Sequence, residues 1–344
     1  MKVGIIGCGA IARQRHAHEY GLNPQAEIAG FYDLQTSRAQ EMVDKFGGRV
    51  YATVEEMLAD ASIDAVSVCV ANKDHASVTI DALKSGKHVL CEKPMATSLS
   101  DCEAMAAAAQ AAGKRLLIDQ NQRLAPAHKK AREILASGAM GRVISFQSTF
   151  GHAGPEMWSV DQSANTWFFK KSLASFGSMA DLGIHKIDLI RYLIGGRVTS
   201  VLSKLATLDK KFPDGTPIEV DDNSVQVLSF DTGVLGTVTT SWTHYGEECN
   251  ATVIYCEKGI LKLYHNPVYS LEMINRDGTR VLYELDAMQT NTDVQQASSG
   301  VIDTFVDAVT ADTQTPLDAE DVLESMRVVF ACVLSNESRA QVNL

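Results

Sequence analysis

The 344-residue chain contains no apolar run that approaches the ~20 residues needed to cross a bilayer, so we expect no membrane-spanning segment. It also lacks a basic excess, because 31 Lys and Arg stand against 42 Asp and Glu, for a net charge of −11. Nucleic acids and anionic membranes select basic surfaces, so neither is expected as a partner. Residues Met1–Ile6 enter a strand directly, and we expect no signal peptide before it.

Paired cysteines are also absent. The seven cysteines form no CxxC motif, and their odd number does not suit a disulfide framework. We therefore expect reduced, mostly buried thiols, no metal site and a cytoplasmic location. No internal repeat or low-complexity tract occurs. With 45% apolar and 21% charged residues, the chain has the composition of a globular protein and is long enough for two domains.

The first segment carries a dinucleotide-binding motif. Val3–Ile6 predicts a buried strand, and a helix is expected to follow as far as about Leu22. Between them lies G-x-G-x-x-A, in the strand-to-helix context that gives this motif its meaning. The glycines permit a tight turn and a close approach of the pyrophosphate, and the helix N-terminus faces the phosphates. The residues expected to bind the cofactor here are Gly7, Gly9, Ala10, Ile11 and Ala12.

Asp33 follows the next predicted strand, Glu27–Tyr32, and lies 21 residues beyond Ala12. A carboxylate at this place accepts hydrogen bonds from both ribose hydroxyls and repels a 2′-phosphate. This favours NAD over NADP as the cofactor. Arg38 is close enough in the sequence to leave NADP open as an alternative.

Strands and helices continue to alternate up to about residue 120. Thr53 and Glu56 have the spacing of a capped helix start. Strands separated by helices of roughly a dozen residues indicate an α/β fold with a doubly wound parallel sheet, which is a Rossmann domain over residues 1–120. The later strands predicted in this domain are Ala65–Val70, His88–Cys91 and Arg115–Ile118.

The strand His88–Cys91 runs directly into Glu92-Lys93-Pro94. Ligands of open α/β sheets bind beyond the carboxyl ends of the strands, so Glu92 and Lys93 are expected in the cofactor crevice. A partly desolvated lysine there can lower its pKa and exchange protons near neutral pH. A solvated surface charge is the alternative interpretation.

After Arg142 the sequence predicts strands joined by turns instead of alternating strands and helices. Residues 231–233 and 276–278 have the composition of hairpin turns. Two helices, near Val294–Thr310 and Ala319–Ser335, are expected to close the chain, with Asp318 as the cap of the second. The predicted strands are 198–208, 224–230, 234–242, 251–256, 260–264, 270–275 and 280–285.

A second group of reactive side chains lies in a predicted helix that begins at Phe176 and runs to Gly195. Asp181 and His185 are four residues apart and therefore project from the same face. A carboxylate beside an imidazole favours the imidazolium and can orient the ring. An ordinary intrahelical pair is the alternative.

Several of these features occur together in one family. They are the GCGAIA opening, Asp33, Asn72-x-x-His75, the segment Asp181-x-Gly-x-His185-x-x-Asp188 and, most specifically, Glu92-Lys93-Pro94. Over essentially the whole chain they resemble the glucose–fructose oxidoreductase / inositol dehydrogenase (Gfo/Idh/MocA) family. The resemblance implies a second domain over residues 121–344, built on a large open, mostly antiparallel sheet, for substrate binding and oligomerisation. It also implies nicotinamide-dependent hydride transfer on a polyhydroxylated sugar or cyclitol.

The resemblance further implies roles for individual residues. Lys93, Asp181 and His185 stand at catalytic positions, with His185 as the base, Asp181 orienting it, and Lys93 hydrogen-bonding the substrate oxygen and relaying the proton. Further cofactor contacts are implied for Ala71, Asn72, His75, Glu92 and Lys93. Substrate contacts are implied for Lys93, Gln122, Arg123, His152, Trp167, Lys171, Asp181 and His185.

The chain departs from the family pattern in two places. Phe176-Gly177-Ser178 stands where relatives often carry three glycines, and Asp119-Gln120 replaces small and aromatic residues. We expect these changes to affect the substrate more than the chemistry. His16 and His18, on the first helix, are not expected to have a function.

Two other functions stay open. One is a glycosidase-like enzyme that retains NAD and oxidises its sugar only transiently, and the other is a non-catalytic sensor that binds NAD and a partner protein. Retention of all three catalytic residues argues against the sensor. An open sheet leaves a face to cover, so we expect a homodimer or homotetramer.

Overall fold

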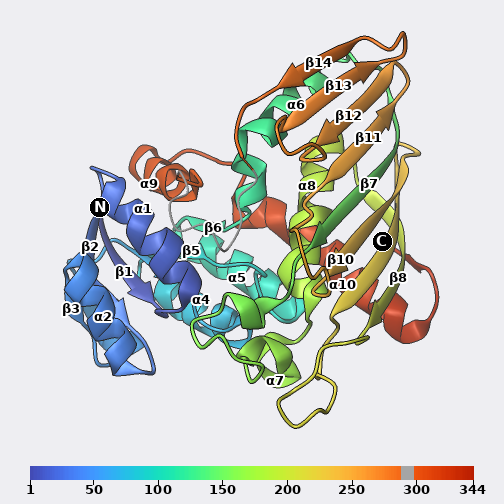
Figure 1. Ribbon diagram of the computed structural model, residues 1–344. Helices are drawn as coiled ribbons and strands as arrows, with labels where there is room; N and C mark the ends of the chain where they lie inside the picture. Colours follow the sequence, from blue (N-terminus) through green and yellow to red (C-terminus); the bar gives the residue numbers. More distant parts are fainter. Residues whose placement is uncertain (288–297) are drawn as a thin grey trace.

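The computed structural model describes residues 1–287 and 298–344 and contains two β-sheets (Figure 1). The N-terminal residues, from blue to teal, form one sheet, and the later residues, from green to orange with a last red strand near the C-terminus, form the other. No helix in the described part of the chain combines the length and the apolarity that a bilayer crossing requires.

The first sheet has six strands in the order β3-β2-β1-β4-β5-β6, all paired in parallel. Every residue of β4 is buried, as expected when helices cover both faces of a sheet. The predicted doubly wound Rossmann sheet is therefore confirmed. Its strands are β1 (Lys2–Ile6), β2 (Glu27–Tyr32), β3 (Arg49–Val50), β4 (Ala65–Val68), β5 (His88–Cys91) and β6 (Leu116–Ile118).

Two helices of this domain begin after residues whose side chains accept hydrogen bonds from free backbone N–H groups, Thr53 and Ser98. Thr53 Oγ1 accepts a hydrogen bond from the Glu56 N–H (3.1 Å), and the Glu56 carboxylate accepts one from the Ala52 N–H (2.8 Å). The predicted capped start is thus confirmed. The first helix differs from the expectation, because a π-helical turn over Ala12–His16 precedes its α-helical part. The helices are α1 (Ala17–Leu22), α2 (Thr36–Phe46), α3 (Val54–Ala59), α4 (His75–Lys84) and α5 (Leu99–Ala112).

The second sheet has nine strands in the order β14-β13-β12-β11-β7-β10-β9-β8-β15. Neighbouring strands are antiparallel except β7 and β10, which confirms the expected mostly antiparallel sheet. Residues of β9 alternate between buried and more exposed positions, so one face packs on helices and the other stays open. The strands are β7 (Val143–Gly151), β8 (Val198–Ala206), β9 (Asn223–Phe230), β10 (Leu235–Ser241), β11 (Thr252–Cys256), β12 (Gly259–Leu263), β13 (Leu271–Asn275), β14 (Arg280–Tyr283) and β15 (Val342–Asn343).

All seven strands predicted for the second half occur, with ends that shift by at most two residues. Strands β7 and β15 had not been predicted. Inward-facing Ser148 weakens the apolar alternation of β7, and the two residues of β15 are too few to give a pattern. The other helices are α6 (Pro126–Ala136), α7 (Lys171–Ala174), α8 (Ile184–Ile194), α9 (Val301–Ala311) and α10 (Ala319–Ser338).

Helix α9 corrects one predicted boundary. A helix start near Val294 lies outside the described residues, and the described helix begins at Val301. The expected cap Asp318 precedes α10, but its carboxylate accepts from the Thr315 N–H (3.0 Å) rather than from the helix.

The two domains share elements from distant parts of the chain. Although α9 follows strands β7 to β14 of the second sheet, it lies beside α1 in Figure 1. Its Phe305 and Val306 are fully buried in one apolar core with Val3 and Ile5 of β1. The domain boundary at residue 120 stays a prediction. The structure adds that α9, from the C-terminal part of the chain, completes the core of the first domain.

Candidate active site

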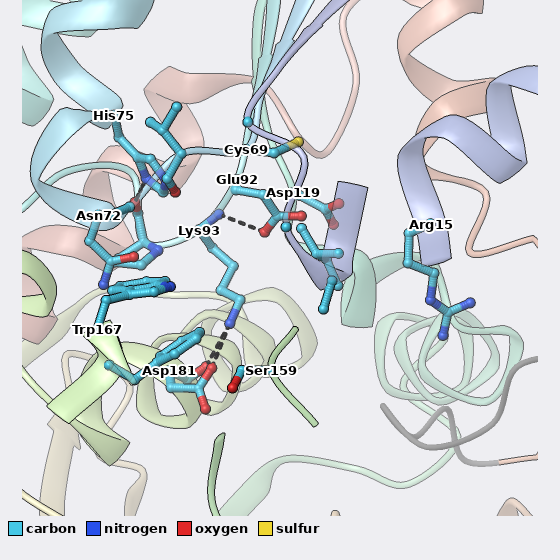
Figure 2. Close-up of a pocket in the computed structure, with 18 of the residues that line it drawn as sticks. Arg15, Cys69, Asn72, His75, Glu92, Lys93, Asp119, Ser159, Trp167 and Asp181 are labelled. Carbon is cyan, nitrogen blue, oxygen red and sulfur yellow. Dashed lines mark hydrogen bonds and ion pairs between the residues drawn. The ribbon is translucent and has the colours of Figure 1, made fainter. Parts of the chain in front are cut away.

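A cavity of about 690 Å³ lies at the carboxyl ends of the parallel strands and is lined by both domains (Figure 2). This is the position at which open α/β sheets bind ligands. The predicted site residues on its wall are Gly7, Gly9, Ala10, Ile11, Asp33, Arg38, Ala71, Asn72, His75, Glu92, Lys93, Gln122, Trp167, Asp181 and His185. Those not on its wall are Ala12, Arg123, His152 and Lys171.

The glycine-rich loop forms one end of the cavity. Gly7 has φ 95°, and a Cβ there would lie 2.4 Å from the Cys69 carbonyl oxygen, so only glycine suits this turn. Gly9 has open space in front of it, which leaves its backbone accessible to a ligand. Ala12 is fully buried under the loop, consistent with a packing role.

Asp33 is held in place by two backbone N–H groups. Its Oδ2 accepts from Cys8 and its Oδ1 from Gln35, both at 2.8 Å, and each oxygen keeps a lone pair for a ribose hydroxyl. Arg38 is engaged elsewhere, because its guanidinium donates to Asp161 Oδ1 of the second domain at 2.6 Å.

The loop after β4 forms hydrogen bonds to two other segments at the centre of the site. Asn72 Nδ2 donates to the Ala174 carbonyl of the second domain at 3.0 Å. The ring nitrogens of His75 lie 2.7 Å from the Pro94 carbonyl oxygen and 3.1 Å from that of Val70. Burial lowers the pKa of His75. His75 therefore positions the Glu92-Lys93-Pro94 turn through its contact with Pro94.

Lys93 reaches across the cavity to the second domain. Its Nζ donates to Asp181 Oδ1 at 2.9 Å and to the Asp181 carbonyl at 3.1 Å (Figure 2). Burial lowers the pKa of Lys93, but Asp181 and Glu92 outweigh it, and the pKa ends above its ordinary value. The expected lowering of this pKa is therefore wrong, and the group is an ammonium that can donate hydrogen bonds.

Asp181 has other partners than the one predicted. Besides Lys93, its carboxylate accepts from Trp242 Nε1 at 3.1 Å and lies 3.6 Å from His152 Nε2. Burial raises the pKa of Asp181, but Lys93 and His152 outweigh it and keep the group ionised. The expected pairing with His185 is not formed. A π-helical turn over Met179–Gly183 replaces the α-helical turn that would have stacked positions four apart.

His185 is consequently an uncharged imidazole. Burial lowers its pKa to about 3, and its Nδ1 has no hydrogen-bond partner among the described residues. The predicted imidazolium is therefore wrong. A neutral ring at the cavity wall can accept a proton from a bound hydroxyl.

The loop before this helix is fixed by a residue that sequence reasoning missed. The Asp221 carboxylate accepts from the Gly177 N–H, the Met179 N–H and the Ser178 hydroxyl, each at 2.8 Å. A Cβ on Gly177 would lie 1.8 Å from the Asp221 carbonyl oxygen. Gly177 is therefore the glycine that lets this loop pack against the backbone of Asp221, although relatives often carry three glycines here.

Three predicted substrate contacts are not formed by side chains on the cavity wall. Arg123 is 1% exposed and bonded to Asp188 (2.6 Å from Nε to Oδ2), because a buried guanidinium needs a carboxylate. Lys171 is exposed, and its backbone N–H donates to Glu219. His152 lies behind Asp181, where it supports that carboxylate.

The remaining two predicted substrate contacts lie on the wall. Gln122 donates from Nε2 to Asn250 Oδ1 at 3.3 Å, and its own Oε1 has no hydrogen-bond partner within residues 1–287 and 298–344. The Trp167 ring stacks on Phe168 with 3.9 Å between centroids. Trp167 is thus packed on one ring face while it lines the cavity.

Two acidic wall residues had been given no role. Glu248 makes no hydrogen bond or ion pair with any residue that the structure describes, and burial raises its pKa to about 7. Asp119, noted in the sequence only as a departure, lies beside Glu92, and both contact buried His16. No local pattern could have united these residues, since they meet only through the fold.

The parallel sheet, the glycine-rich loop and Asp33 define an oxidoreductase with an NAD-binding Rossmann domain. Residues 1–120 match the family described as "Oxidoreductase family, NAD-binding Rossmann fold", and residues 128–262 match "GFO/IDH/MocA C-terminal domain". The chain belongs to the Gfo/Idh/MocA family, which confirms the resemblance of its motifs.

Known relatives match over most or all of the chain. D-glucoside 3-dehydrogenase of Escherichia coli (strain K12) is 28% identical over 357 residues, which cover 100% of this chain and 97% of the relative. Levoglucosan dehydrogenase of Pseudarthrobacter phenanthrenivorans is 31% identical over 275 residues, which cover 72% of this chain and 68% of the relative. The solved structure of levoglucosan dehydrogenase with NADH and levoglucosan shares the fold, with a TM-score of 0.85 at 22% identity and coverage of 100% and 99%.

Proposed function

We propose that this protein transfers a hydride reversibly between a secondary alcohol of an uncharged sugar or cyclitol and the nicotinamide of NAD. The observation that carries this proposal is the convergence of Lys93, Asp181 and His185 in the cavity that starts at the glycine-rich loop. The family relatives named above, which are sugar dehydrogenases, support the substrate class. When bound, NAD would supply the hydride acceptor.

The roles of the three side chains follow from their charges. His185, an uncharged imidazole on the cavity wall, takes the hydroxyl proton. Lys93 donates a hydrogen bond to the same oxygen and stabilises the negative charge that develops there. Asp181 holds the Lys93 ammonium in position at 2.9 Å. Where it is ionised, above its pKa of about 7, the Glu248 carboxylate at the wall disfavours phosphorylated and acidic sugars, because like charges repel.

A substrate panel tests the proposal. Purified protein with NAD is offered neutral sugars, cyclitols, sugar phosphates and sugar acids, and the absorbance of NADH is followed. We expect net NADH formation with at least one neutral compound and weaker rates with its phosphorylated counterpart. Substrate conversion without net NADH would instead point to transient oxidation, and inertness toward the whole panel would count against the proposal.

A first prediction concerns the adenosine end of the site. NAD(H) is expected to bind at least several-fold tighter than NADP(H), since Asp33 repels a 2′-phosphate and Asp161 occupies Arg38. Asp33→Ser should narrow this gap, and adding Asp161→Asn should narrow it further by releasing Arg38. Calorimetric titration with both cofactors measures this, with Asp44→Asn as the control. Equal or reversed affinities in the unmutated protein would show that Arg38 governs the ribose site.

A second prediction concerns assembly. Leu202, Val225 and Leu235 lie on the open face of β8, β9 and β10 and are 49%, 48% and 51% exposed. Exposed apolar side chains grouped on one sheet face are typical of an interface. We expect a homodimer or homotetramer by light scattering at micromolar concentration.

Acidic substitution on this face tests the interface. The double variant Leu202→Asp/Val225→Asp should dissociate the assembly, whereas Leu22→Asp on α1, 64% exposed in the monomer, should not. A monomeric unmutated protein would refute the prediction.

We also propose a cytoplasmic location. The seven cysteines are all free, and six of them are buried. Thiols in this state suit a reducing compartment. Fractionation of the native host, with the protein followed by antibody, tests the location, and recovery outside the cytoplasm would contradict it.

A further inference from the structure

Three ionisable side chains form a buried cluster directly beside Lys93. Glu92 follows β5, Asp119 follows the neighbouring strand β6, and His16 comes from the π-helical turn after β1. His16 Nε2 lies 3.0 Å from Glu92 Oε1 and 3.6 Å from Asp119 Oδ2. Figure 2 shows Glu92 and Asp119 adjacent to each other at the wall of the cavity, above the ammonium of Lys93.

The charges of this cluster do not balance. Burial lowers the pKa of His16, but Cys69 and Glu92 outweigh it and the pKa rises, so the ring keeps its proton. That single positive charge faces two carboxylates. Lys93 does not compensate for the second one, because its own charge is matched by Asp181.

Asp119 is the member that can take up a proton. Glu92 is stabilised as an anion by His16 and also accepts from the Lys93 N–H at 3.2 Å, whereas no side-chain hydrogen bond reaches Asp119 from the described residues. Burial and the charge of Glu92 raise the pKa of Asp119 to about 8. The titratable groups that face Asp119 are Glu92 and Lys93 after β5, Cys69 after β4, and His16, Glu19 and Tyr20 of the first helical segment.

The cluster adjoins the place where the nicotinamide is expected. Asp119 and Glu92 line the same cavity as the Gly9 loop and Lys93. Glu92 is the chain neighbour of Lys93, so the nicotinamide, which must reach the proposed substrate oxygen at Lys93, is expected next to this cluster. The oxidised ring carries a positive charge and the reduced ring carries none.

We propose that Asp119, through the cluster that it forms with Glu92 and His16, selects the oxidised cofactor over the reduced one. The proposal rests on the placement of NAD given above. Ionised Asp119 attracts the positive ring across a cavity of low polarity, while NADH gains nothing from it. Because of this cluster, the affinity of the protein for NAD⁺ relative to NADH increases as the pH rises and Asp119 loses its proton.

Binding measurements on both cofactors test this without turnover. Dissociation constants for NAD⁺ and NADH are measured by calorimetry at pH 6.5 and pH 9 for the unmutated protein, Asp119→Asn, Asp119→Glu and the exposed control Asp44→Asn. In the unmutated protein and the control, the ratio Kd(NADH)/Kd(NAD⁺) should rise about tenfold between the two pH values. Asp119→Asn should remove this rise by weakening NAD⁺ alone, and Asp119→Glu should restore most of it.

Three other results would contradict the proposals. A ratio that stays flat in the unmutated protein overturns the inference, even if Asp119→Asn fails to fold. Equal weakening of NAD⁺ and NADH in a folded Asp119→Asn variant assigns the residue a purely structural role and also overturns it. Failure of the unmutated protein to bind either cofactor would overturn the functional proposal itself.

Discussion

Replacing Lys93 by methionine or His185 by alanine is expected to lower turnover by about 10²–10⁴-fold, the usual contribution of general acid–base catalysis. In the proposed arrangement Lys93 brings a positive charge from the first domain to the substrate oxygen, and His185 supplies the uncharged base. NAD affinity should change little, because the glycine-rich loop and Asp33 provide most of the cofactor contacts. Steady-state kinetics measures the first effect and calorimetry the second.

The double variant Lys93→Met/His185→Ala should lose much less than the product of the single losses, since residues that act on one oxygen are not additive. His18→Ala and Lys129→Met, both exposed and not among the residues that line the cavity, are matched controls that should keep full turnover. Near-normal turnover in His185→Ala would remove this residue as the proton acceptor and leave Lys93 alone in that role.

The second large effect is expected on stability. Arg123→Met should lower the free energy of unfolding by about 3–5 kcal/mol, because it removes the cation paired with the buried carboxylate of Asp188 and leaves only the Ser325 hydroxyl bonded to it among the described side chains. Arg123 also donates to the Pro316 carbonyl and to Asp321, so the change loosens the segment before α10 as well. Urea denaturation measures the effect. Turnover per folded molecule should be retained, because the guanidinium does not face the cavity.

Two comparisons sharpen this measurement. Arg142→Met removes an exposed pair with Glu257 and should cost at most about 1 kcal/mol. Arg123→Met/Asp188→Leu removes both buried charges and should recover part of the loss. Unchanged stability together with a raised KM for the sugar would contradict the structural role and return Arg123 to the substrate site.

Local motifs predicted the first domain and the Lys93 turn well, because each depends on a few consecutive residues. The strand before Gly7, the acid at Asp33 and the strand before Glu92 are all local features, and the structure confirms their positions. The protonation states were not predictable in the same way. A helical spacing of four suggested that Asp181 would charge His185, whereas the π-helical turn and burial among residues of other segments reverse that result.

Contacts between distant residues account for the other errors. Arg123 meets Asp188 65 positions later, and His16 meets Glu92 76 positions later. From the sequence, Arg123 was expected to contact the substrate, and His16 was expected to have no function. Only the three-dimensional arrangement shows that Arg123 is internal and that His16 adjoins the reactive centre.

The return of α9 to the first domain also affects how this chain is made. Val301 follows Ile118, the last residue of the first sheet, by 183 positions. At about 5–20 residues per second, a ribosome needs roughly 10–40 s to synthesise the intervening chain. During that time the apolar side chains that Phe305 and Val306 later cover remain exposed on the nascent Rossmann sheet. The cofactor domain therefore reaches its final core only after strands β7 to β14 of the second sheet have been synthesised, and chaperones can bind its exposed apolar side chains in the meantime.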